Sequence, residues 1–492
     1  MAYRLWQLLS QSHAKGGKVT LREKRARRVA RYAVLAVALS LVVAPLRAGQ
    51  DAASGQVTFT KDIAPILQRS CQNCHRPGSG APMSLTTYEE VRPWARSMKR
   101  RTELVGKPDV MPPWYIEKTI GIQRYKDDMS LTSAEIATIG RWADAGAPKG
   151  NTADMPAALT FDDERVWRLG KPDLIVASPQ VEVQAVQADW WGSLGVVPTG
   201  STEDRYVASV EIREVIDLVD VPEGADRQKM TAGKKVFHHL IYDIIGPDGR
   251  RTSEIQWPAH EAGRNPDIFD PETGRLLSAG SKVGFFSSHH HASGLRTKAH
   301  VEIGFRFHPK GYKPTKKLLN LRVNASGELD IPGNTAGTKI EGYLVLQQNA
   351  KLMIFEPHLH AAGVRMCLEA IWENTTETLS CAGYNHNWVR VYSFADDAQP
   401  LLPKGTILRA TSYFDTTVAN ANVGDQRNWS GLGHRSTDNM AIGMTTGIEL
   451  SDQEFEQEMA KRREQLRLSA GQTIIGCPLC GVVKDRRTAA NH

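Results

Sequence analysis

Residues 71–75 read Cys-Gln-Asn-Cys-His, a spacing that can attach a haem covalently. Two thiols three residues apart can form thioether bonds to both vinyl groups of the porphyrin, and the adjacent histidine can then ligate the iron. The alternative interpretation is a disulfide beside an unrelated histidine. With six cysteines and fifteen histidines in 492 residues, an accidental match to the whole pattern is rare. The sequence therefore predicts one covalent c-type haem held by Cys71, Cys74 and His75.

A second group of candidate ligands is rich in histidine, since twelve of the fifteen lie between residues 238 and 434. His358 and His360 are two apart near a strand-like run. Side chains alternate along a strand, so these two can project to one side and chelate one metal ion. His238 and His239 are adjacent, and they can share an ion only at a bend or a bulge.

The run 299–308 separates apolar side chains from histidines. Its apolar face consists of Val301, Ile303, Phe305 and Phe307. His300 and His308 lie on the other face, so His308 can point away from the apolar layer, with His300 as its nearest alternative. The run His289–His291 indicates a solvated polar loop or an extra metal-binding loop. We interpret His260, His386 and His434 as structural.

The elements that must position these residues differ between the two halves of the chain. In the first half, Thr132 and Glu135 form a capping box that predicts an amphipathic helix ending near Gly146. Between residues 173 and 448, alternating runs such as 206–216 and 301–307 predict strands. The predicted fold is multidomain, with a small all-α domain followed by two all-β lobes of the jelly-roll-like β-sandwich kind.

The predicted domain boundaries follow these changes in pattern. They are an export signal or uncleaved anchor at 1–48, a haem domain at 57–150, a linker at 151–172, β lobes at 173–330 and 331–450, and a tail at 451–492. Within the tail, Ser451–Arg467 predicts a solvated amphipathic helix. Cys477 and Cys480 are too few for structural zinc, and they predict a local disulfide or free thiols. Cys367 and Cys381 form the remaining plausible disulfide.

The N-terminus predicts export to the periplasm or secretion. A basic block from Arg22 to Arg31 precedes the apolar run Ala33–Leu46 and a small-residue site at Ala48, as in a signal peptide. The run is short for a membrane span of about 20 residues, and an uncleaved anchor with membrane association is the alternative. Residues 1–48 hold ten Lys or Arg and one Glu, so the net charge of +7 becomes +7 − 9 = −2 without them. Nothing argues for nucleic-acid binding.

Three motifs in the first half occur in a recognisable order. They are Phe-Thr-Lys-Asp-Ile at 59–63 leading into Cys71–His75, Met-Pro-Pro-Trp at 111–114, and Trp-Ala-Asp-Ala-Gly-Ala-Pro at 142–148. Together they resemble the small class I-like cytochrome c domains of bacterial exported proteins. The resemblance implies His75 as the proximal iron ligand and Met111 as the sixth ligand, with Met83, Met98 and Met129 as competitors.

Four motifs in the second half also have a specific order. They are Phe-His-His-Leu at 237–240, Phe-His-Pro-Lys-Gly at 307–311, His-Leu-His at 358–360 and Ser-Thr-Asp-Asn-Met at 436–440. This order resembles the copper type II, ascorbate-dependent monooxygenases, the family of peptidylglycine alpha-hydroxylating monooxygenase and dopamine beta-monooxygenase. The resemblance implies an electron-transferring copper on His238, His239 and His308, and a dioxygen-binding copper on His358, His360 and Met440. Asn439 departs from the acidic residue usual in the family.

The resemblances imply an exported oxidoreductase with one covalent haem and two copper ions. The expected reaction is hydroxylation of a C–H bond by dioxygen, on a small-molecule or peptide-like organic substrate, with electrons from an external donor passing through the haem. Two alternatives remain open from the sequence. One is an electron-transfer or copper-binding module without hydroxylase activity, and the other is a structural or carbohydrate-binding β-sandwich with vestigial sites.

Overall fold

The computed structural model describes residues 55–77, 79–161, 167–226, 230, 233–252, 256–264, 266–435 and 437–481. The chain from Val57 onward forms one compact unit. The predicted signal or anchor at 1–48 lies outside the described residues. Within the described ranges, no helix is long and apolar enough to span a membrane.

Short helices surround the Cys-x-x-Cys-His motif, as the helical pattern predicts. They are η1 (Phe59–Ile63), α3 (Ala64–Ser70), α4 (Tyr88–Val91), η2 (Arg92–Trp94), α5 (Ala95–Thr102), α6 (Ser133–Asp144) and η3 (Thr152–Asp154). The predicted capping box of Thr132 and Glu135 begins α6. Phe59, Leu67 and Trp142 are buried in a common core, so α6 packs on the segment that leads into Cys71. The assignment of this helical region as a cytochrome c domain stays a prediction.

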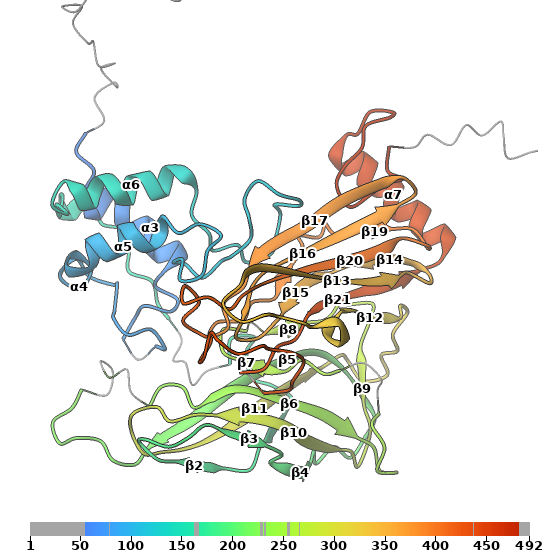
Figure 1. Cartoon of the computed structure of the whole chain (residues 1–492), viewed down its shortest axis with the longest axis horizontal. Helices are drawn as coiled ribbons and strands as arrows, with labels where there is room; N and C mark the ends of the chain where they lie inside the picture. Colours follow the sequence, from blue (N-terminus) through green and yellow to red (C-terminus); the bar gives the residue numbers. More distant parts are fainter. Residues whose placement is uncertain are drawn as a thin grey trace, which may run out of the picture. The chain divides into compact units, whose positions relative to one another are not determined.

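Two antiparallel sheets follow, and we call them the N-lobe (Figure 1). One sheet contains β1 (Leu174–Ala177), β11 (Thr297–Phe307), β5 (Arg205–Leu218) and β8 (Asp267–Ile268), with β2 (Val181–Val183) and β9 (Arg275–Leu277) beside them. The other contains β3 (Trp190–Gly192), β10 (Lys282–His290), β6 (Phe237–Ile245), β7 (His260–Glu261) and β4 (Gly195–Pro198). Ile303 and Phe305 of the first sheet share a core with Tyr242 and Phe285 of the second, so the two sheets enclose one apolar layer.

A second pair of antiparallel sheets forms the C-lobe. One sheet contains β18 (Tyr392–Ser393), β15 (Ile354–His358), β21 (Ile442–Leu450), β14 (Asn349–Leu352), β19 (Leu401–Leu402) and β12 (Leu318–Asn324). The other contains β13 (Ala336–Val345), β20 (Ile407–Asp415), β16 (Gly363–Trp372) and β17 (Thr375–Gly383), with η4 (Ser326–Glu328) in the connection from β12. The prediction of a β-rich second half is confirmed, while the jelly-roll connection stays a prediction.

The border between the lobes lies earlier than the predicted residue 330. Strand β12 pairs with β21 from Leu318 opposite Ile448 to Asn324 opposite Ile442. It is therefore part of a C-lobe sheet, although the sequence analysis placed it in the N-lobe. Alternation of apolar residues predicts that a segment is a strand, but it does not say which sheet the strand joins.

Part of the predicted haem domain packs into the C-lobe. Trp114, Ile116, Ile122 and Tyr125 are buried in the C-lobe core, and isolated bridges pair Ile116 with Ala382 and Tyr125 with Phe394. We call residues 114–126 the bridging segment. It joins the helical region to the C-lobe through buried apolar contacts rather than through an exposed linker.

The tail docks on the C-lobe. Helix α7 (Asp452–Leu466) begins with a capping box of Ser451 and Glu454, which confirms the predicted helix. Its Phe455 and Met459 pack against a buried disulfide between Cys477 and Cys480, so one face is buried rather than solvated. The other predicted disulfide, Cys367 to Cys381, joins β16 and β17.

Candidate functional site

The Cys-x-x-Cys-His motif forms a turn at the end of α3. The backbone N–H of Cys71 donates to the carbonyl of Leu67 at 2.9 Å, and the N–H of His75 donates to the carbonyl of Cys71 at 2.9 Å. Residues three and four apart on such a turn lie on the same side, so both thiols and the imidazole can face one porphyrin. Cys71 and Cys74 form no disulfide with each other, and haem attachment by this motif stays a prediction.

The tautomer of His75 fits an iron ligand. Its Nδ1 lies 3.1 Å from the carbonyl oxygen of Met83, and because a carbonyl only accepts, Nδ1 carries the proton. The lone pair is then on Nε2, and burial lowers the pKa of His75 so that the ring stays neutral. A ligating histidine commonly has its second nitrogen fixed in this way. Burial, followed by the charge of Cys74, raises the pKa of the Cys71 thiol to about 12, unlike a reactive redox thiolate.

The candidate sixth ligands have different surroundings. Met98 is buried in the core of the helical region, and Met83 packs against the same core. Met129 packs against the C-lobe core. Met111 is 40% exposed, and its backbone N–H donates to the carbonyl of Arg101. Met111 is therefore the one of the four that no apolar core holds, and its role as sixth ligand stays a prediction.

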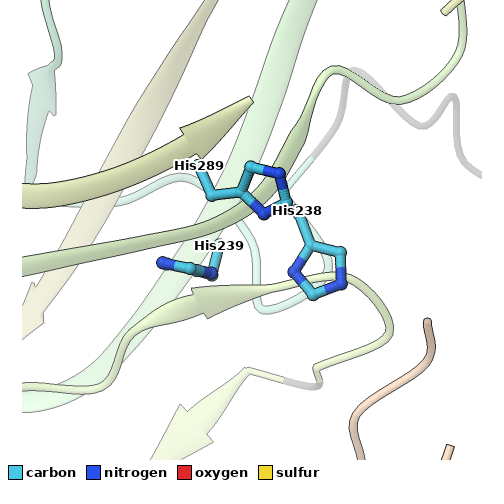
Figure 2. Close-up of side chains that lie close together, drawn as sticks. All are labelled: His238, His239 and His289. Carbon is cyan, nitrogen blue, oxygen red and sulfur yellow. The ribbon is translucent and has the colours of Figure 1, made fainter. Parts of the chain in front are cut away.

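A bulge brings the adjacent histidines of β6 together. In the pairing of β6 with β10, His239 is opposite His289 and Phe237 is opposite His290, so His238 is an extra residue in the ladder. Ligand atoms of His238, His239 and His289 all lie within 4.8 Å of one another. Figure 2 shows the three rings gathered at this point. The sequence predicts that these neighbours can share an ion only at a bend or a bulge, and the backbone has a bulge at His238.

The rings around the bulge are held from outside. Nε2 of His289 lies 3.0 Å from a carboxylate oxygen of Asp189, and its ring stacks on Trp191 at 4.4 Å between centroids. Nε2 of His238 donates to the carbonyl of His386 at 3.1 Å. Carboxylate and carbonyl acceptors on one ring nitrogen orient the other nitrogen toward a metal.

The structure does not group His308 with His238 and His239. Its Nε2 donates to the carbonyl of Thr273 at 2.8 Å, and its ring stacks on Tyr312 at 3.8 Å. The reason is topological, since His308 follows β11, which belongs to the other sheet of the N-lobe, whereas β10 is the neighbour of β6. His289 occupies the position that the sequence analysis gave to His308.

The second predicted ligand set lies at the end of β15. Ligand atoms of Glu261, Glu356 and His358 lie within 4.8 Å of one another, and the rings of His358 and His360 are 5.2 Å apart. Met440 lines the same cavity as these residues. Asn439 is buried, and its side-chain oxygen accepts from the N–H of Ala362 at 3.1 Å. Asn439 therefore fixes the loop that carries Met440 beside Ala362, which follows His360 by two residues.

Both ligand sets border one cavity of about 1100 Å³. Five of its lining residues are histidines of these sets or close to them: His238, His239, His358, His360 and His386. Residues of both lobes contribute to its wall, among them Phe286 of β10 and Ile354 of β15. A cavity of this size accommodates a small organic molecule or a peptide side chain.

Several ring nitrogens in this region fit a metal ion better than a hydrogen-bonded core. The Nδ1 atoms of His238, His360 and His386 are buried and have no hydrogen-bond partner among the described residues. A buried polar atom without a partner costs about 1–3 kcal/mol, and three such atoms around one cavity need a common explanation. Imidazole nitrogens suit copper in both oxidation states, and a soft thioether favours Cu(I).

A buried ion cluster fixes the two lobes beside the histidines. Arg264 of the N-lobe pairs with Glu261 at 3.1 Å, with Asp267 at 3.1 Å and with Glu356 of the C-lobe at 2.7 Å. Nδ1 of His358 lies 3.6 Å from Glu261. Although burial opposes it, the nearby imidazole of His358 and the charge of Arg264 lower the pKa of Glu261. The carboxylate thus remains charged between the guanidinium and the imidazole.

We predict that Arg264→Leu destabilises the protein by about 3–5 kcal/mol, because it leaves buried carboxylates without their cation. The same substitution at Arg427, whose side chain is 83% exposed beside Asp425, should change stability by no more than about 1 kcal/mol. Denaturant unfolding followed by tryptophan fluorescence measures both effects. Equal stability of the two variants would show that the cluster does not hold the lobes together.

The histidines around the cavity resist protonation. Burial, together with the charge of His289, lowers the pKa of His238 to about 4. Burial, followed by the neighbouring imidazole of His238, lowers the pKa of His239 to about 3 and that of His386 to about 3. These rings are neutral at physiological pH, which is the form that binds a metal.

This resistance predicts that the metal-free protein loses stability in mild acid. Each such imidazole is neutral in the folded protein and takes up a proton on unfolding between about pH 4 and pH 6.5. The free energy of unfolding is therefore unaffected above pH 6.5, and below it each imidazole lowers this free energy by about 1.4 kcal/mol per pH unit. Urea unfolding of chelator-treated protein at pH 7, 6 and 5 tests this. His386→Gln removes one titrating ring and should reduce the slope of the free energy of unfolding against pH. An unchanged slope would show that His386 is not one of the rings that stay neutral in the folded protein.

One loop packs beside the histidines. In residues 384–391, between β17 and β18, the ring of His386 lies 4.7 Å from that of His238. Trp388, two residues on, packs against Lys235 at 3.8 Å. Arg390, two further, is buried, and its guanidinium donates to the carbonyl of Gly263 at 3.1 Å. The loop therefore packs against the N-lobe on both sides of Trp388.

Two residues of the site were not predicted in their present roles. His289 belongs to a run that the sequence analysis treated chiefly as a solvated loop. It lies instead near the end of β10. His386 was interpreted as structural. The signal for His289 was weak, because residues 282–290 read Lys-Val-Gly-Phe-Phe-Ser-Ser-His-His and do not alternate beyond Val283 and Phe285. For His386 no pattern in the sequence exists, since it lies in an irregular loop.

Comparisons with known proteins identify no family. No family model matches the chain, and no curated protein matches it. Among solved structures, the tandem CBM22-1–CBM22-2 domain of Paenibacillus barcinonensis Xyn10C is 9% identical with a TM-score of 0.12, covering 51% of this chain and 82% of that one. The infectious bursal disease virus Gx strain structure is 7% identical with a TM-score of 0.14, covering 60% and 90%. The VP2 subviral particle of that virus is 10% identical with a TM-score of 0.15, covering 60% and 89%. These scores carry no argument about fold or function.

Proposed function

We propose that the chain is an exported oxidoreductase that carries one covalent haem and two copper ions and hydroxylates a C–H bond with dioxygen. The observation that carries the proposal is the meeting of His238, His239, His358 and His360 at one cavity, on the same chain as a Cys-x-x-Cys-His turn. His289 lies beside the first two. Both disulfides suit an oxidising compartment outside the cytoplasm.

The helical region is proposed as a cytochrome c domain. Cys71 and Cys74 would attach the haem, and His75 would ligate its iron through Nε2, with Met111 as the proposed sixth ligand. A bound haem would supply electrons one at a time. The chain's own contribution is to fix the His75 ring through the carbonyl of Met83.

The lobes are proposed as the copper module. His238, His239 and His289 would hold one ion, and His358, His360 and Met440 would hold the other. Bound copper would supply electrons to dioxygen and accept them from the haem. Asp189 and the carbonyl of His386 orient the first set, Glu261 orients His358, and the cavity walls separate the reacting groups from bulk water.

Contacts between the helical region and the N-lobe support electron delivery within one chain. The ammonium of Lys234, four residues before His238, donates to the carbonyl of Ser79, four residues after His75. The neighbouring Lys235 packs against Trp388, two residues after His386. A connection within one chain replaces a diffusive encounter between two proteins.

Reduced full-length protein mixed with ¹⁸O₂ and a panel of small organic and peptide substrates tests the proposal. We expect two copper ions and one haem per chain, and one ¹⁸O atom in the product. Oxygen consumption without labelled product would favour the electron-transfer alternative. Absence of copper after loading would rule out the copper module altogether.

A further inference from the structure

A second bulge in β10 lies beside the cavity. The register of β10 against β6 shifts between Phe285 and Ser287, so Phe286 is an extra residue in the ladder. A bulge re-aims the side chain that it carries. Phe286 is 38% exposed, whereas its neighbour Phe285 is buried in the N-lobe core. The bulge therefore turns Phe286 to the outer face of the sheet, away from that core.

A glycine leaves room for the Phe286 ring on this outer face. A side-chain Cβ at Gly284 would lie 2.6 Å from Cζ of Phe286 and 2.9 Å from Cδ1 of Ile245. The ring thus lies over the backbone of β10 and beside Ile245. Arg251 holds it from one side, because its guanidinium lies 5.1 Å from the ring centroid and pairs with Asp243 at 3.0 Å. The ring is consequently fixed in place while part of it stays open to solvent.

Apolar side chains continue from this ring in both directions. Ile241 lines the cavity together with Phe286, and it lies two residues from His239 on the same face of β6. In the other direction, Val196 of β4 is opposite Gly284 and is 51% exposed. An apolar surface thus leads from a proposed copper ligand out of the cavity. We call the residues of this surface the apolar strip: Ile241, Phe286, Ile245 and Val196.

The apolar strip is unusual for the solvated face of a sheet. The exposed face of an antiparallel sheet is ordinarily polar. The four residues of the strip are far fewer than the roughly 20 residues that each side contributes to a stable protein interface. The strip is instead continuous with the cavity, whose volume of about 1100 Å³ is at the upper end of the range for ligand pockets. An elongated apolar ligand that reaches from the cavity onto the strip fits these observations better than a protein partner.

We propose that the apolar strip binds an elongated apolar part of the substrate, with Phe286 as a residue that determines specificity. The inference rests on the proposed function, because it takes the cavity as the place of the reaction. The substrate class is an organic molecule with an alkyl or aryl body long enough to extend from the cavity past Phe286. The ring is already fixed, so it loses little freedom when such a body packs on it, and burial of the body adds to affinity.

A homologous series of neutral probes tests this assignment. Full-length protein, first copper-free and then copper-loaded, is titrated calorimetrically with 1-butanol, 1-hexanol and 1-octanol. Affinity should rise about fourfold per added CH₂, the equivalent of about 0.8 kcal/mol. In Phe286→Ala the gain from hexanol to octanol should be lost. Gly284→Val should have the same effect, because its side chain would occupy the place of the ring.

Trp94→Ala is the matched control for Phe286→Ala. Trp94 is an aromatic residue of the helical region with a similar exposure of 41%, and its replacement should leave the wild-type affinities for all three alcohols.

The outcomes separate this inference from the proposed function. Affinities that do not depend on chain length, or that are equal in the wild type and Phe286→Ala, would overturn the strip as a ligand site. Self-association of the wild type that Phe286→Ala abolishes, measured by sedimentation, would assign the strip to an interface between copies and overturn the inference as well. Alcohol binding through Phe286 in a protein that takes up no copper would uphold the strip as a ligand site and overturn the proposed function.

Discussion

Replacing Cys71 and Cys74 by serine should yield a protein without covalent haem whose copper can no longer be reduced by an external donor. Serine cannot form the thioether bonds, and His75 alone does not retain a haem through denaturation. Acid-acetone extraction measures the loss, which should be complete. Stopped-flow spectroscopy of the copper absorption then measures reduction by the donor, while total copper should remain at the wild-type level.

The chain contains a matched control for this experiment. Cys477→Ser with Cys480→Ser removes the same number of sulfur atoms from a buried disulfide, and it should leave both haem attachment and copper reduction intact. Haem that stays with the polypeptide after both motif cysteines are replaced would refute the attachment site. Wild-type rates of copper reduction in the haem-free protein would show that the haem does not feed the lobes.

The second large effect is expected at the end of β15. His358→Ala should remove one of two copper ions and lower product formation from dioxygen by more than about 100-fold, since even groups behind the ligands typically contribute 10–100-fold. His300→Ala is the control, because His300 lies beside Glu302 in β11, at 3.7 Å. Copper analysis and oxygen-uptake kinetics measure the two effects. Full copper content in His358→Ala would contradict its assignment as a ligand.

Met440→Ala separates copper binding from oxygen chemistry at the same site. His358 and His360 remain, so most copper should be retained. The soft thioether that favours Cu(I) is lost, and reoxidation by dioxygen should slow much more than copper content falls. Unaltered oxygen reactivity would remove Met440 from the proposed site.

Local patterns predicted the elements well. The alternation in 206–216 and 301–307 predicted β5 and β11, and the capping boxes predicted the starts of α6 and α7. These signals depend on neighbours in the chain. The spacing of Cys71, Cys74 and His75 predicted haem attachment, which stays a prediction; the backbone forms a turn there.

The errors concern which strands become neighbours. His308 has the alternation expected of a ligand, but β11 lies in the sheet that excludes β6. Strand β12 was placed in the wrong lobe for the same reason, because period-two patterns do not encode strand order. His386 and Arg264 were beyond prediction, since a loop residue and a buried guanidinium acquire their surroundings only when the two lobes close.

The bridging segment 114–126 restricts how this architecture can change in evolution. Trp114, Ile116 and Tyr125 complete the C-lobe core, and Glu117 pairs with Arg365 of β16. A gene rearrangement that exchanged the whole of 57–150 for another domain would uncover that core and lose the partner of Arg365. Such an exchange therefore requires the incoming domain to retain these thirteen positions, which makes the two halves heritable as a unit rather than as interchangeable modules.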